Sequence, residues 1–336
     1  MSKPFKGPIT TFESTAVRMQ GYYPFSNEIT GIVSAVAERQ TSMSYQGFMK
    51  EVGFNGVITP EPAEGFTPTS IVDIRPREHD PKAAIMVHLA MANPLDPNQL
   101  MQIATIAAAN PNSRVIASGN PSGKGYGTGL LHGKQLWQVA RGDYRPTVEP
   151  LVRYAEQQGI EEAAQVGFSF GVEKGHTAAA FDAFKTTHDV AIEPVPIVRR
   201  PVLWLATKFM LTGGPLEEYV NANGNPAFRE ARNDSVTMTQ YISGLGRLTN
   251  IAIAEGMTHA TSMKRWAKAI EQNPDMISTF AWGSDSELAK DNQMFNNVMH
   301  ARAGQENVHH IRIEGGKHNM VNDLALQSAI IKTGLR

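Results

Sequence analysis

The chain has 336 residues, of which 41% are hydrophobic and 19% are charged, and its 31 basic and 32 acidic side chains nearly cancel. This composition is typical of a globular protein rather than a disordered chain, and the balanced charge disfavours nucleic acid and anionic membranes as partners. The absence of cysteine excludes disulfides, thiolate metal ligands and a cysteine nucleophile.

The N-terminal region carries no targeting signal that we recognise. Residues 1–8 contain two lysines but no apolar stretch follows them, and no run in the chain approaches the roughly 18 apolar residues that cross a bilayer. We therefore expect a soluble protein, with the cytoplasm as the default compartment. Residues 1–60 form an N-terminal segment to which the sequence assigns no role; residues 27–38 have a helical pattern, whereas 16–21 and 52–58 are compatible with strands.

From residue 69 onward, short runs rich in β-branched residues alternate with helical patterns. Strands are predicted at residues 70–74, 83–89, 114–117, 164–167, 190–192, 277–282 and 309–313, with Asp73 turned outward from the first of them. Asp96 and Pro97 begin one intervening helix as N-cap and first helical residue. This alternation predicts an α/β fold with a mostly parallel, doubly wound sheet.

Residues 201–262 interrupt the alternation. They contain several helical patterns and no predicted strand, and their apolar side chains, Trp204 among them, would suit the roof of a pocket. We expect a helical cap or lid inserted into a core that residues 61–200 and 263–336 form.

The segment from Gly167 to Gly171 matches the motif G-x-S-x-G around Ser169. It stands between a predicted buried strand and a helix, where a nucleophilic serine is lifted clear of a sheet on a tight turn. Small residues two positions before and after the serine relieve the clash that such a turn creates. Because short glycine–serine patterns also arise by chance, the weight of the motif depends on its partners.

The partners follow in the expected chain order. A serine needs a histidine to take its proton and a carboxylate to orient the histidine, and in strand–turn–helix proteins the order is serine, acid, histidine. Asp285 and His318 each come just after a predicted strand, as Ser169 does. Since ligands bind at the carboxyl edge of open α/β sheets, these residues indicate a catalytic triad of Ser169, His318 and Asp285.

On these motifs the sequence resembles the α/β-hydrolase fold superfamily over residues 69–336. Residues 120–127 add a match to the D-x-P-G-x-G-x-S turn that many members carry. The resemblance implies transfer of an acyl group to water through an acyl-serine intermediate, without cofactor or metal. It also provides an alternative acid, Glu193, because some members carry the acid one strand earlier.

The same resemblance implies an oxyanion hole with two backbone donors. One is the N–H of Phe170, and the other is that of Ala90 or Met91, although the sequence has Leu89 after His88 where many members have glycine. His88 itself is interpreted as structural. No metal-ligand spacing, P-loop or dinucleotide motif occurs, so neither metal nor cofactor is expected.

The sequence thus predicts a serine hydrolase that cleaves a carboxylic ester of a small-molecule acyl substrate. Two alternatives remain. One is a non-catalytic protein that uses this fold for binding or assembly. The other is an acyltransferase, thioesterase or peptidase with the same triad, which fold analogy alone does not separate from an esterase.

Overall fold

The computed structural model describes residues 15–61, 68–76, 82–90, 95–121, 129–195, 201, 204 and 246–336. Within these ranges a seven-stranded sheet forms the centre, in the order β1-β3-β2-β4-β5-β6-β7. The strands are β1 (Ile71–Ile74), β2 (Ala83–His88), β3 (Arg114–Ser118), β4 (Glu162–Phe168), β5 (Lys185–Ile192), β6 (Ile277–Gly283) and β7 (Val308–Ile313). Each corresponds to a strand that the sequence predicts.

The sheet is parallel except at one edge. β1 runs antiparallel to β3, whereas all other neighbouring pairs are parallel. β2 and the second half of β5 read as near-continuous apolar runs, as expected of strands with both faces covered. The prediction of a mostly parallel, doubly wound sheet is therefore confirmed, and the carboxyl ends of β2, β4, β5, β6 and β7 meet at one edge.

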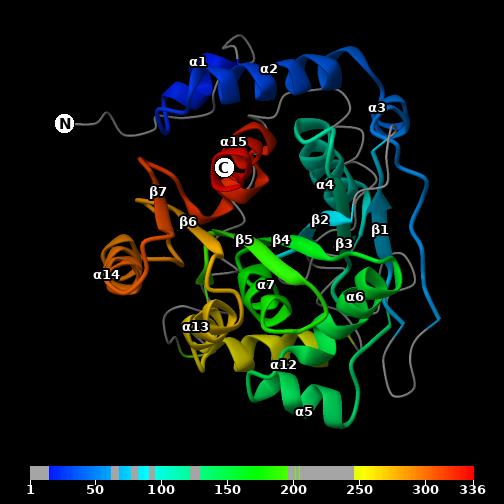
Figure 1. Cartoon of the computed structure of the whole chain (residues 1–336), viewed down its shortest axis with the longest axis vertical. Helices are drawn as coiled ribbons and strands as arrows, with labels where there is room; N and C mark the ends of the chain where they lie inside the picture. The colour runs from blue at the N-terminus through cyan, green and yellow to red at the C-terminus, as the bar shows by residue number, and fades with distance from the viewer. Residues whose placement is uncertain are drawn as a thin grey trace.

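Helices cover both faces of the sheet (Figure 1). One face carries α4 (Pro97–Ala109) and α15 (Leu324–Gly334), and the other carries α6 (Arg145–Gln157), α7 (Gly171–Ala179) and α13 (Ser262–Gln272). α5 (Lys134–Ala140) packs with α12 (Gly246–Met257) beyond the second face, and α14 (Asp291–Arg302) lies beside β6 and β7. No helix in the described ranges is both long and apolar enough to cross a bilayer.

The described residues of the N-terminal segment are largely helical and add a further layer outside α4 and α15. They form α1 (Thr15–Gln20), α2 (Asn27–Ser42) and α3 (Tyr45–Glu51). The helix expected at residues 27–38 is confirmed, and its N-cap is Ser26, whose hydroxyl accepts from the N–H of Ile29.

The two strands considered in this segment are absent from the described structure. Residues 15–20 are helical because the buried side chain of Met19 packs into the core that α2 and α15 share. Of residues 52–58, only Ile58 pairs with the sheet, through an isolated bridge to Ile71. A short apolar run does not distinguish a strand from a buried helical turn, and tertiary packing decides between them.

Most of the predicted cap lies outside the described residues, including 202–203 and 205–245. Its described part contains α12, which ends at Met257 and is followed by α13 from Ser262. The division of the chain into an N-terminal segment, a core and a cap thus stays a prediction.

Asp73 is buried rather than turned outward, because a cation in the next strand binds it. Its side chain is 2% exposed, and Arg114 on β3 binds both carboxylate oxygens, with Nε–Oδ1 and Nη2–Oδ2 distances of 2.8 and 2.6 Å. Burial alone would raise the pKa of Asp73, but hydrogen bonds from Arg114 and Tyr154 outweigh it and lower that pKa.

Replacing Arg114 tests how strongly this pair stabilises the edge of the sheet. Arg114→Met leaves the buried Asp73 carboxylate with the half-exposed Arg75, at 3.2 Å, as its remaining cation, so we expect a loss of about 2–3 kcal/mol of unfolding free energy. Arg153→Met is the matched control, because Arg153 forms a solvent-exposed pair with Glu149 worth less than about 1 kcal/mol. Denaturant titration measures both, and equal losses would contradict the prediction.

Candidate active site

Ser169 occupies the turn that joins β4 to α7. Its φ is +54°, in the left-handed region that a side chain rarely adopts. Its N–H donates to the carbonyl of Ile192 at the end of β5, at 2.8 Å, which holds the turn at the carboxyl edge of the sheet. A strained serine between a strand and a helix is the arrangement of a nucleophile elbow.

Two glycines make this turn possible. A Cβ atom on Gly171 would lie 1.9 Å from the carbonyl oxygen of His88, and one on Gly167 would lie 2.5 Å from the Cα of Val172. No side chain fits at either position without moving the backbone. The clash that the sequence motif predicts is therefore present on both sides of Ser169.

His318 lies at the start of a 3₁₀ helix, η2 (His318–Asn322), after β7. Its side chain is almost completely buried, and its Nδ1 is 2.9 Å from Oε2 of Glu193. Its backbone N–H donates to Glu287 Oε2 at 3.3 Å. With Nδ1 on a carboxylate, Nε2 is the nitrogen that can exchange a proton with a hydroxyl.

Glu193 follows β5 and is completely buried. Besides His318, its carboxylate accepts hydrogen bonds from the N–H of Gly283 at 2.6 Å and from the hydroxyl of Ser286 at 2.5 Å. Like Ser169, it has a positive φ, of 52°. Three donors therefore orient a carboxylate that faces the imidazole and not water.

Asp285, which the sequence favours as the acid, does not contact His318. Its side chain is exposed and accepts from the hydroxyl of Ser284 at 3.1 Å, while its N–H donates to the carbonyl of Gly316. The turn after β6 packs so closely against the turn after β7 that a Cβ on Gly283 would lie 2.0 Å from that carbonyl oxygen. As a result, the side chain that reaches Glu193 from this turn is that of Ser286, one residue further on, and not that of Asp285.

The alternative acid Glu193 is thus the residue that the structure pairs with His318. Sequence reasoning missed Ser286 altogether, because a serine in a turn carries no signal of its own. Ser169 and His318, both within the described residues, form no hydrogen bond with each other. Such contacts often tighten only when substrate binds.

The two expected oxyanion donors flank the elbow. Phe170 follows Ser169 directly, at the N-terminus of α7, and is completely buried. Ala90 follows β2 and is half-buried, and its carbonyl accepts from Nδ2 of Asn120 at 2.5 Å. Met91, the alternative donor, and residues 122–128 of the glycine-rich turn lie outside the described residues.

An apolar wall adjoins the elbow. The side chain of Phe170 belongs to a buried cluster and meets the ring of Tyr144 edge to face, with centroids 5.0 Å apart. The other buried members of this cluster are Leu131, Val139, Val195, Ala252, Ile253, Met257 and Leu288, and Trp204 packs against it. Among the described residues, no three histidine, aspartate or glutamate side chains gather as a metal site.

A second serine–histidine–aspartate set lies in the core, beneath α13. The ring of His176 on α7 contacts Asp189 Oδ2 and Ser262 Oγ, both at 2.9 Å. All three side chains are buried, and Ser262 begins a regular helix rather than a strained turn. We interpret this set as a structural link between α7, β5 and α13.

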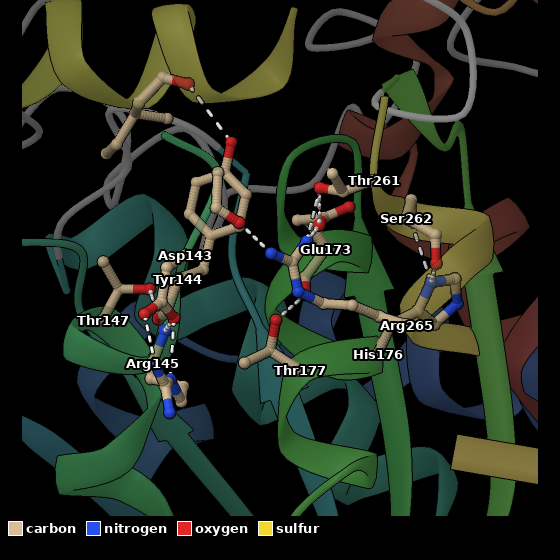
Figure 2. A network of polar contacts seen from close by, with 12 residues as sticks. Asp143, Tyr144, Arg145, Thr147, Glu173, His176, Thr177, Thr261, Ser262 and Arg265 are labelled. Atoms are coloured by element: carbon tan, nitrogen blue, oxygen red, sulfur yellow. Dashed lines mark hydrogen bonds and ion pairs between the residues drawn. The ribbon is translucent and has the colours of Figure 1, made fainter. Parts of the chain in front are cut away.

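Figure 2 shows the contact of His176 with Ser262 beside a second link between α7 and the start of α13. There Glu173 forms an ion pair with Arg265 and accepts from the hydroxyl of Thr261 at 2.9 Å. Arg265 also donates to the carbonyl of Gly142. The helix that starts at the elbow is therefore anchored along one side by buried polar contacts.

Comparison with known proteins identifies the fold alone. No protein-family model and no curated protein matches the sequence. Among solved structures, a hydrolase from Pseudomonas aeruginosa PA01 has a TM-score of 0.56 and 9% identity, over 84% of this chain and 98% of that chain. A haloalkane dehalogenase from Paraglaciecola agarilytica NO2 has a TM-score of 0.55 and 13% identity, over 83% and 92%. A serine hydrolase from Cycloclasticus zankles has a TM-score of 0.54 and 12% identity, over 83% and 99%.

His88 makes the stability of this region dependent on pH. Burial, reinforced by the nearby positive charge of Lys174, lowers the pKa of His88 to about 3. The unfolded chain therefore binds a proton below pH 6.5 that the folded chain does not, and stability falls as the pH drops from 6.5 toward 3. At about 1.4 kcal/mol per pKa unit, His88 costs roughly 2 kcal/mol between pH 7 and pH 5.

Denaturant titration of the wild type and of His88→Gln at these two pH values measures that contribution. We expect the wild type to lose about 2 kcal/mol more than the variant, which has no titrating ring. Equal losses in the two proteins would contradict the assignment of this acid sensitivity to His88.

Proposed function

We propose that this chain, which has the α/β-hydrolase fold, is a serine hydrolase in which Ser169, His318 and Glu193 form the catalytic triad. The observation that carries the proposal is the strained backbone of Ser169, held at the edge of the sheet where the paired His318 and Glu193 also lie. Strain of this kind is costly and persists where the surrounding packing enforces it. An ordinary β–α connection needs neither the positive φ nor the two glycines.

In the proposed reaction, the Ser169 hydroxyl attacks the carbonyl carbon of the substrate while Nε2 of His318 takes its proton. The tetrahedral intermediate then expels its alcohol, to which the imidazolium returns the proton. An acyl-serine remains. Water, deprotonated by the same nitrogen, attacks this ester, and collapse of the second intermediate releases the acid and restores the serine.

Glu193 would act by stabilising the imidazolium and fixing the tautomer of His318. The Ser286 hydroxyl and the Gly283 N–H hold the carboxylate in place, so that little reorganisation is needed when the positive charge forms. We assign the two oxyanion donors to the N–H of Phe170 and to that of Ala90 or Met91. Each such donor typically contributes about 3–4 kcal/mol to transition-state stabilisation.

The apolar cluster beside Phe170 supports an acyl substrate with an uncharged, hydrophobic group. Contact with such side chains favours apolar surface at about 25 cal/mol per Å² buried. We therefore propose a carboxylic ester of a small molecule as the substrate class. A thioesterase, peptidase or acyltransferase would use the same residues and differ in the leaving group or acceptor, and profiling with matched esters, thioesters and amides separates these activities.

Ser169→Ala tests the nucleophile. A fluorophosphonate probe should label the wild type and leave the variant unlabelled, because the probe forms a covalent bond with an activated serine. The thermal midpoints of the two proteins should agree within a few degrees. A variant that is labelled as well as the wild type removes Ser169 from the mechanism, and an unlabelled, folded wild type supports the non-catalytic alternative.

Glu193→Gln compared with Asp285→Asn tests the acid. Both substitutions remove one negative charge and keep the side-chain size, but only the first changes the partner of His318. We expect Glu193→Gln to lower kcat on a short-chain nitrophenyl ester by about 10²–10⁴-fold, since the amide neither fixes the tautomer nor balances the imidazolium. Asp285→Asn should stay within about threefold of the wild type. A larger loss for Asp285→Asn would reverse the assignment.

A further inference from the structure

A buried lysine lies close to Leu89 and Ala90, the described residues after β2, which we call the oxyanion loop. It plays no part in the triad. Lys174, in the first half of α7, is completely buried, and burial lowers the pKa of its ammonium group to about 7. Within the described residues no carboxylate pairs with it; its Nζ donates to Oδ1 of Asn120 at 3.0 Å. A buried cation without a counter-charge costs stability, so an apolar side chain would serve packing better.

The contact continues from Asn120 to the loop after β2. Nδ2 of Asn120 donates to the carbonyl of Ala90 at 2.5 Å, so one amide links α7, the turn after β3 and the residue proposed as an oxyanion donor. The direction of the link follows from chemistry. In its ammonium form lysine only donates hydrogen bonds, so the amide oxygen faces Lys174 and the amide nitrogen faces Ala90.

This link controls the orientation of a backbone carbonyl beside the elbow. The end of β2 lies against α7, since a Cβ on Gly171 would clash with the carbonyl oxygens of His88 and Leu89. A carbonyl of this loop that turned toward the reacting atoms would repel an oxyanion. While Ala90 O is bound to Asn120, that rotation would break a hydrogen bond inside the protein.

We propose that Lys174 and Asn120 are positioning residues that keep the carbonyl of Ala90 from turning toward the oxyanion hole. Lys174 selects the rotamer of the Asn120 amide, and the amide clamps the carbonyl of Ala90. The inference rests on the proposed function, and it adds two residues that neither the motif nor the triad includes. The role of the lysine is to orient a neutral donor and not to touch the substrate.

The first experiment compares Lys174→Met with the wild type on the nitrophenyl ester. Because the oxyanion forms only in the transition state, we expect kcat to fall by about 10–100-fold while KM changes by less than about twofold. The thermal midpoint should stay or rise, because the variant removes a buried charge. Lys82→Met is the matched control: Lys82 is an exposed lysine paired with Glu161, and its loss should leave kcat unchanged.

Asn120→Asp separates positioning from packing. The aspartate still accepts a hydrogen bond from Lys174, and the ion pair strengthens this contact. It has no N–H group to donate to the carbonyl of Ala90. We expect the same loss in kcat as in Lys174→Met with the fold retained, and a Lys174→Met/Asn120→Asp double variant no slower than the slower single variant.

Unchanged kcat in folded Lys174→Met and Asn120→Asp, with fluorophosphonate labelling of Ser169 intact, would overturn this inference and leave the proposed function standing. A lower thermal midpoint with unchanged kcat would make Lys174 a structural residue, which also overturns it. A folded wild type that the probe does not label would contradict the proposed function and this inference together.

Discussion

The close packing of α7 against the ends of β4 and β2 is the constraint on which the candidate site depends. It requires glycine at positions 167 and 171, because any side chain there would meet the backbone of Val172 or of His88. With α7 this close to the sheet, the connection to it must turn sharply, and Ser169 takes up the left-handed conformation. The same helix carries Phe170 at its start and Lys174 one turn later, where Lys174 contacts Asn120, the residue that binds the carbonyl of Ala90.

Residue types alone do not separate the proposed triad from its buried counterpart. His176, Asp189 and Ser262 have the chemistry of a serine–histidine–acid set and comparable distances, yet all three are buried in the core and none of them has the positive φ of Ser169. Ser169 and His318 instead occupy turns at the carboxyl edge of the sheet. The difference is one of location, since the middle of a sheet offers no approach to a substrate whereas its carboxyl edge does.

The contacts of the N-terminal helices indicate what these helices do in the structure. Arg18 on α1 binds Asp323 at 3.2 Å, and Asp323 caps α15 by accepting from the N–H groups of Ala325 and Leu326. α15 begins directly after the short helix that carries His318. The segment of the chain whose sequence carries no motif thus supports the C-terminal helix next to the proposed base.

The order of strands and helices, the elbow around Ser169 and the position of His318 could all be predicted from the sequence, because periodicity and the G-x-S-x-G spacing are local properties. The choice of Glu193 over Asp285 could not, since both follow a parallel strand and only the contact between Gly283 and Gly316 decides which side chain of the later turn faces inward. The burial of Lys174 could not be predicted from the sequence either. The sequence pattern of a helix is the same whether its lysine faces water or packs against a loop from another part of the chain. Only tertiary packing decides between these two environments.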